Sequence, residues 1–186
     1  ITASRLMGIV DFVNIFVRSK LQSNPENRMG FLTMAGDSCL VKESLTDDID
    51  QLSSSLGSLS PNGDLKLIHG IKIARLALAS RGAVRCDRRI VVFICSPVSY
   101  DEEKFNSLGI LLRKENIAVD VINIGNSENS AKLEEFVQAV NKDSNSKYLN
   151  IEREVNVVDF LRTEYLATSS SEPVVTEGDS LDADME

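Results

Sequence analysis

The stretch Arg89-Ile90-Val91-Val92-Phe93-Ile94-Cys95-Ser96-Pro97 decides the fold of this chain. It is a run of β-branched and aromatic residues that stops at a Ser-Pro turn. Because consecutive side chains of a strand point to opposite faces, an unbroken apolar run requires cover on both sides. Such a strand is typical of the middle of a parallel sheet with helices on its two faces.

The end of this strand is where a ligand would be expected, because open α/β sheets bind ligands at the carboxyl ends of their strands. Here that end carries Cys95, Ser96 and Pro97, with no aspartate, no glycine-rich loop and no histidine. The sequence therefore predicts a carboxyl edge without the groups that break bonds or hold cations.

Hydrophobic periodicity and turn residues divide the rest of the chain into helices and strands. We expect helices over residues 6–22, 48–56, 65–81, 101–114, 131–141 and 157–168, the third of them ending at Gly82. We expect further strands at 29–35, 39–45, 117–124 and 147–151, the first two joined by a tight turn at Gly36-Asp37. The strand at 117–124 is expected to be apolar on both faces.

This order predicts an α/β fold, a doubly wound, mostly parallel sheet with one antiparallel edge strand. The first helix has a broad apolar face but no strand before it, although right-handed crossovers place a strand ahead of such a helix. We expect that a first central strand precedes Ile1 and is missing from this chain, the alternative being a fold that begins with a helix. Residues 1–168 are expected to form this amino-terminally incomplete domain, and 169–186 an acidic disordered linker.

Charge and cysteine content narrow the class of partner. Six of the 28 acidic residues lie between Glu172 and Glu186, a segment with no base, so the remainder is nearly neutral. Arg85, Arg88 and Arg89 are interpreted as a charged loop before a strand, so no basic face for nucleic acid is expected.

No apolar run is long enough to span a membrane. Three widely spaced cysteines fit neither a disulfide framework nor a zinc site, and they indicate a reducing compartment, cytoplasm or nucleus.

Individual residues offer little chemistry. His69 is the only histidine, so a half-buried helix residue is favoured over a general base or metal ligand. Cys95 is interpreted as a buried structural thiol rather than a nucleophile. Ser96 and Asp64 are too few for a cation cage, and the Gly57–Asp64 loop is interpreted as a flexible connection. We assign no catalytic, cofactor-binding or metal-binding residue, and the partner-binding residues stay unknown.

Several segments together resemble a von Willebrand factor A domain, in the branch of the proteasome regulatory-particle subunit that serves as a polyubiquitin receptor. The similarity covers about residues 3 to 168, and it is carried by Ser23-Asn24-Pro25-Glu26-Asn27 with Gly30, by Leu65 to Leu78, by Ile90 to Pro97, by Asn116 to Gly125 and by Leu133 to Asn141.

The resemblance implies a non-catalytic subunit without a working metal site or cofactor, which docks between the lid and base of the regulatory particle. In that family, polyubiquitin is bound by helical motifs after the A domain. Ser180–Glu186 is acidic but lacks their Leu-x-x-Ala-Leu-x-x-Ser core, so polyubiquitin recognition is expected through motifs outside this chain.

Three alternatives stay open from the sequence. The chain could be an A-domain scaffold subunit of another large assembly such as a transcription or DNA-repair factor, although the cysteine-rich zinc modules of those relatives are missing here. It could be a metal-dependent ligand-binding A domain. It could also be a small-molecule enzyme, because a fold does not settle a function.

Overall fold

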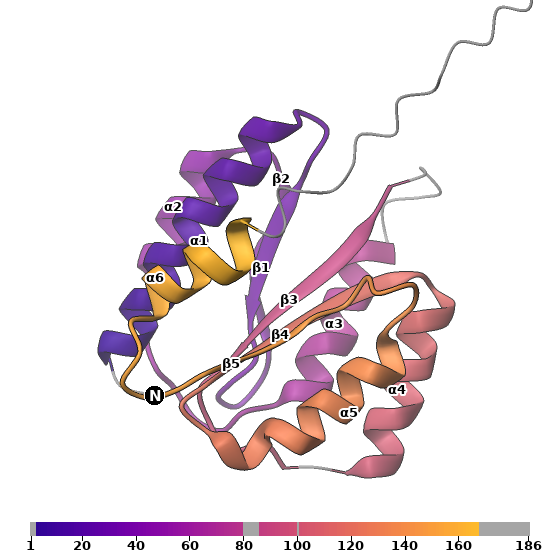
Figure 1. Cartoon of the computed structure of the whole chain (residues 1–186). Coiled ribbons are helices and arrows are strands. Elements are labelled where there is room, and N and C mark those ends of the chain that lie inside the picture. Colours follow the sequence, from indigo (N-terminus) through magenta and orange to yellow (C-terminus); the bar gives the residue numbers. More distant parts are fainter. Residues whose placement is uncertain (1–2, 80–85, 100, 168–186) are drawn as a thin grey trace, which may run out of the picture.

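The computed structural model describes residues 3–79, 86–99 and 101–167. Within them a three-stranded parallel sheet lies between two layers of helices (Figure 1). β3 (Arg88–Ile94) pairs with β4 (Ile117–Ile124), and β4 pairs with β5 (Tyr148–Ile151). The predicted α/β fold with a mostly parallel sheet is confirmed.

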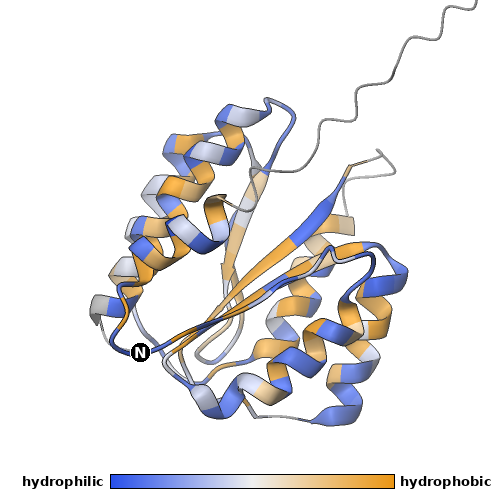
Figure 2. Cartoon of the chain, viewed as in Figure 1, coloured by the Kyte–Doolittle hydropathy of each residue, from blue (hydrophilic) through white to orange (hydrophobic). Residues whose placement is uncertain are grey.

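One face of this sheet carries α3 (Leu67–Ala79), α4 (Glu102–Lys114) and α5 (Ser130–Val140). Their apolar sides meet alternate residues of β3 and β4 in the larger core cluster. The helices are two-faced in Figure 2, orange toward the strands and blue outside. The predicted bounds of these three helices agree with the structure within about two residues, and Gly82 lies outside the described residues.

The other face is covered by α1 (Ala3–Ser23), α6 (Val157–Leu161) and η2 (Arg162–Leu166). Phe12 of α1 is fully buried, and its ring centroid lies 6.1 Å from that of Phe93 on β3. The predicted single helix at 157–168 divides here, because its second half is a π-helix. A π-helix has a wider turn and changes the direction in which the following side chains point.

β1 (Met29–Thr33) and β2 (Leu40–Thr46) form the expected antiparallel pair, followed by α2 (Ile49–Gly57). This pair is a sheet of its own, and no ladder joins β1 to β3 in the described part of the chain. α1 nevertheless packs against both sheets. Met29 of β1 belongs to the core cluster that α1 forms with the parallel sheet, and also to the cluster that α1 forms with α2. The strand expected ahead of Ile1 stays a prediction.

The tight turn expected at Gly36-Asp37 is wrong in its length. β1 ends at Thr33 and β2 begins only at Leu40. The connecting segment is drawn toward the start of α3: the Lys66 amide donates to the Met34 carbonyl at 2.7 Å, and the Gly36 amide to the Asp64 carbonyl at 3.2 Å. Backbone groups that bond to another segment are not available to close a two-residue hairpin.

Two further expectations need correction. Arg88 and Arg89 do not lie in a loop but are the first residues of β3. β4 is buried along its whole length, yet it is not purely apolar, because Asp120 and Asn123 are both fully buried within it. No described helix has the length and apolar character needed to cross a bilayer.

Candidate functional site

The carboxyl edge of the parallel sheet is held together by asparagine side chains. Asn129, which is 2% exposed, links the loop after β3 to the loop after β4. Its Oδ1 accepts from the Val98 amide at 2.9 Å, and its Nδ2 donates to the Ser96 carbonyl at 3.0 Å. The same Nδ2 lies 3.2 Å from Oδ1 of Asn123 on β4. A single amide therefore fixes the edge just beyond Cys95.

Asn123 extends this network to β5. Its Nδ2 donates to the Asn126 carbonyl at 2.7 Å and to Asn150 Oδ1 at 2.8 Å. Carboxamides carry no charge and do not titrate, so they act here as neutral connectors rather than as acids, bases or nucleophiles. Within the described residues, no three histidine, cysteine or acidic side chains are grouped so that they could hold a metal ion.

The residues singled out from the sequence are not brought together. Cys95 is half-buried, and burial raises the pKa of its thiol to about 11, with Arg5 acting weakly in the opposite direction. It is therefore a thiol and not a thiolate at neutral pH. The backbone carbonyl of Asp64 accepts from the Gly36 amide, as described above, and Asp64 itself is exposed. His69 is exposed on α3 rather than half-buried, which corrects the expectation.

A cavity of about 280 Å³ adjoins this edge, between the start of α3 and the segment that leads from β3 to α4. Its lining includes Lys66, His69 and Lys72 from α3 and its approach, Val98 and Ser99 after β3, and Lys104 from the first turn of α4. Sequence reasoning missed this cavity, because Lys66, His69 and Lys72 lie close together in the chain but meet Val98, Ser99 and Lys104 only in the folded domain.

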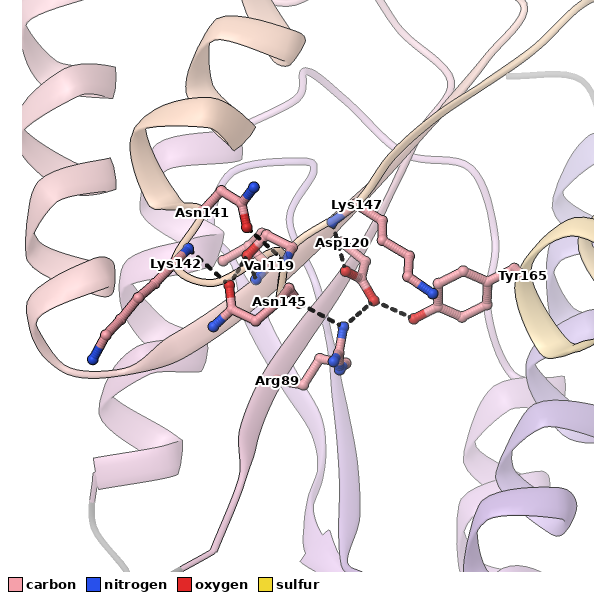
Figure 3. Close-up of polar contacts among 9 residues, drawn as sticks. Arg89, Val119, Asp120, Asn141, Lys142, Asn145, Lys147 and Tyr165 are labelled. Carbon is pink, nitrogen blue, oxygen red and sulfur yellow. Dashed lines mark hydrogen bonds and ion pairs between the residues drawn. The ribbon is translucent and has the colours of Figure 1, made fainter. Parts of the chain in front are cut away.

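A second polar cluster lies toward the amino-terminal end of the strands (Figure 3). The Asp120 carboxylate, 1% exposed, accepts from Tyr165 Oη at 2.6 Å, from Arg89 Nη1 at 2.7 Å and from the Lys147 amide at 2.9 Å. Each carboxylate oxygen therefore has a donor, as a buried charge requires. The sequence signal that could have found it is an aspartate inside an otherwise apolar strand.

Tyr165 is the side chain that connects this cluster to η2. Burial raises the pKa of its phenol far above the ordinary value, and the neighbouring Asp120 carboxylate acts in the same direction. The phenol therefore stays protonated and serves as a permanent hydrogen-bond donor. A protonated tyrosine on a carboxylate that Arg89 also neutralises is a structural connection between the last helix and the sheet, with no proton to transfer near pH 7.

Comparison with known proteins gives consistent results. The model of the von Willebrand factor type A domain family matches residues 2–97. The chain is 35% identical over 150 residues to the 26S proteasome non-ATPase regulatory subunit 4 homolog of Oryza sativa subsp. japonica, an alignment that covers 80% of this chain and 37% of the relative. It is 34% identical over 141 residues to the 26S proteasome regulatory subunit rpn10 of Schizosaccharomyces pombe, covering 76% of this chain and 58% of the relative.

The solved structure of the SpRpn10 VWA domain is also similar, with a TM-score of 0.78 and 30% sequence identity. The likeness covers 86% of this chain and 84% of that domain. The chain thus corresponds to nearly the whole of a solved domain, whereas it spans less than two thirds of the length of these curated relatives.

Proposed function

We infer, because this chain belongs to the von Willebrand factor type A domain family and within it to the Rpn10 type, that it is a non-catalytic subunit of the 26S proteasome regulatory particle. The observation that carries the proposal is the agreement of the sequence comparison with the structure comparison, since both lead to proteins named as Rpn10. A fold alone would not support it, because the same fold serves many functions.

The carboxyl edge supports a role that depends on shape. The amides of Asn123 and Asn129 bind each other and the neighbouring loops there. The nearest thiol, Cys95, is held protonated by burial. Neither group supplies a nucleophile, a general base or an anionic metal ligand. We therefore propose that the domain works by docking and has no enzymatic activity.

The proposed partners are the other subunits of the regulatory particle, in its lid and base. Polyubiquitin is proposed to bind through motifs outside this chain, and neither nucleic acid nor membrane is a proposed partner. We propose that the chain is located in the cytoplasm and the nucleus, together with the regulatory particle. Which surface contacts which subunit is left open by this proposal.

Affinity purification tests the proposal. The tagged chain is expressed in eukaryotic cells, and the captured proteins are identified by mass spectrometry. We expect lid and base subunits of the regulatory particle to be enriched with the wild-type chain. The matched control is Phe12→Asp, which places a charge in a fully buried position of the core and removes the folded domain. The proposal would be rejected if the wild-type chain captured no regulatory-particle subunit, or if the control captured the same proteins as the wild-type chain.

A calorimetric titration with Mg²⁺ and with Ca²⁺ separates this function from that of a metal-dependent ligand-binding A domain. We expect no heat of binding, because hard cations require several carboxylate or hydroxyl oxygens around one point, and Asn129 Oδ1 already accepts from Val98. Micromolar affinity for either ion would favour the metal-dependent alternative.

A further inference from the structure

The cavity at the start of α3 has features that the proposed function above does not use. We call it the basic cavity, and we define it by its basic residues Lys66, His69, Lys72 and Lys104 and by its apolar residues Leu67 and Val98. It lies where β3 ends, which is the edge at which open α/β sheets bind their ligands. The asparagine network reaches its border through the bond of Asn129 to the Val98 amide, but no described asparagine lines the cavity.

The charge of the basic cavity is opposite to that of the protein. The chain carries a net charge of −8, yet no described residue that lines the cavity is acidic. The first turn of α3 also contains no acidic residue, so the positive end of the helix dipole adds to the field of the lysines. Outside the acidic segment Glu172–Glu186 the chain is nearly neutral, so long-range attraction for an anionic group is concentrated at this one cluster of lysines.

The positive charges of this cavity are available to a ligand. Lys66 Nζ donates to the backbone carbonyl of Asp37, a neutral acceptor that does not cancel its charge. Lys72 is exposed. Lys104 forms an ion pair with Asp101 at 2.5 Å, but its side chain is 67% exposed. Exposed ion pairs of this kind are weak, because solvent screens them, so a carboxylate of a ligand can replace Asp101.

The floor and the size of the cavity indicate what kind of ligand fits. Leu67 and Val98 are almost completely buried and present an apolar floor beneath the basic rim. A volume of about 280 Å³ is at the lower limit for a small-molecule site, where about 300–1,000 Å³ is usual, so one or two side chains of a peptide match it better. Apolar floor and basic rim together match an apolar side chain flanked by carboxylates.

We propose that the basic cavity is a docking site for an acidic peptide segment of a partner protein, with an apolar side chain on Leu67 and Val98 and adjacent carboxylates on Lys72 and Lys104. This inference goes beyond the proposed function, and its test uses the isolated chain, so either can fail without the other. The affinity of such a contact depends on salt, because most of its charges are exposed to solvent.

Fluorescence anisotropy with a labelled synthetic peptide tests the site. The probe contains two leucines that alternate with glutamates, and the control probe has glutamine in place of each glutamate. We expect the full 186-residue chain to bind the glutamate probe, to bind the glutamine probe at least about tenfold more weakly, and to lose affinity as the NaCl concentration rises.

A pair of charge-reversed variants locates the site. Lys72→Glu with Lys104→Glu is expected to weaken binding at least about tenfold, because two attractions become repulsions. The matched control, Lys42→Glu with Lys114→Glu, changes the net charge equally at exposed positions outside the cavity and is expected to bind as wild type does. All four substitutions are at the surface, and circular dichroism confirms that each variant is folded.

Three outcomes would overturn the proposal. The first is that the wild-type chain does not bind the glutamate probe, and the second is that both double variants bind it equally. The third concerns the acidic segment Glu172–Glu186 of this chain. If neutralising its six acids shifts the NMR signals of Lys72 and Val98 with no peptide added, that segment occupies the cavity, and a partner does not.

Discussion

Replacing Tyr165 with phenylalanine tests whether the Asp120 cluster connects the last helix to the sheet. The substitution removes the Oη donor that lies 2.6 Å from Asp120 Oδ2 and leaves the ring in place. A hydrogen bond to a charged group contributes about 1.5–3 kcal/mol. We therefore expect the free energy of unfolding to fall by about 2 kcal/mol, and Tm by about 4–8 °C for a domain of this size.

Urea denaturation followed by far-ultraviolet circular dichroism measures this loss, which suits a chain without tryptophan. The matched control is Tyr148→Phe, because the Tyr148 hydroxyl makes a long contact, 3.4 Å from Asn123 Nδ2. We expect that control to lose less than about 1 kcal/mol. Equal stability of the two variants would refute the assignment of the Tyr165 hydroxyl to the buried carboxylate.

The pH dependence provides a second readout of the same contact. The pKa of Tyr165 is raised in the folded protein, first by burial and then by Asp120, whereas an unfolded tyrosine ionises near pH 10. Above pH 10 the unfolded chain binds fewer protons than the folded chain, so the contribution of Tyr165 is complete below pH 10 and is lost as the pH rises. Wild type should lose stability more steeply than Tyr165→Phe, by about 1.4 kcal/mol per pH unit; parallel curves would contradict this reasoning.

The remaining predictions concern the thiols, the carboxyl edge and the carboxyl-terminal segment. At pH 8, exposed Cys86 should react rapidly with a maleimide and Cys95 should not, because a pKa of about 11 leaves about one thiolate in a thousand; rapid labelling of Cys95 in peptide mass spectra would contradict this. Asn129→Ala should cost about 3 kcal/mol in urea denaturation, since three hydrogen bonds of about 1 kcal/mol each are lost, and a loss below about 1 kcal/mol would show that the amide network is not stabilising. We propose from composition that residues 169–186 form a linker, so limited proteolysis should cleave there first and leave a resistant fragment of residues 1–168; initial cleavage within α4 or α5 would exclude these domain bounds.

The elements that the sequence predicted best are those whose signals are local. β4 was predicted with its observed bounds, Ile117–Ile124, because its mainly apolar run lies between Asn116 and Gly125. In the structure both of these residues have positive φ, 53° and 71°. The starts of α2 and α4 agree with the predicted ranges within one residue and are likewise fixed locally, since the side chains of Asp48 and Asp101 accept from amides two or three residues onward.

The features that the sequence did not predict depend on residues far apart in the chain. The Asp120 carboxylate is bound by Arg89 and Tyr165, which are 31 and 45 residues away in the chain. Hydrophobic periodicity therefore shows Asp120 only as a polar residue within an apolar strand and does not identify its partners. The long β1–β2 connection follows from the bond of Lys66 to Met34. The basic cavity likewise forms only when α3 and α4 are placed beside the end of β3.

The π-helix at Arg162–Leu166 makes this segment sensitive to its length. Its wide turn sets the direction of Tyr165 toward Asp120, and a π-helix holds one more residue per hydrogen-bonded loop than an α-helix. Deleting one residue would let an ordinary α-helix form, and the rotation that follows would carry the phenol away from the carboxylate. Substitution of the exposed side chains in this segment leaves that spacing unchanged, so the residue count of the segment matters more to the Tyr165 contact than the identity of its surface residues.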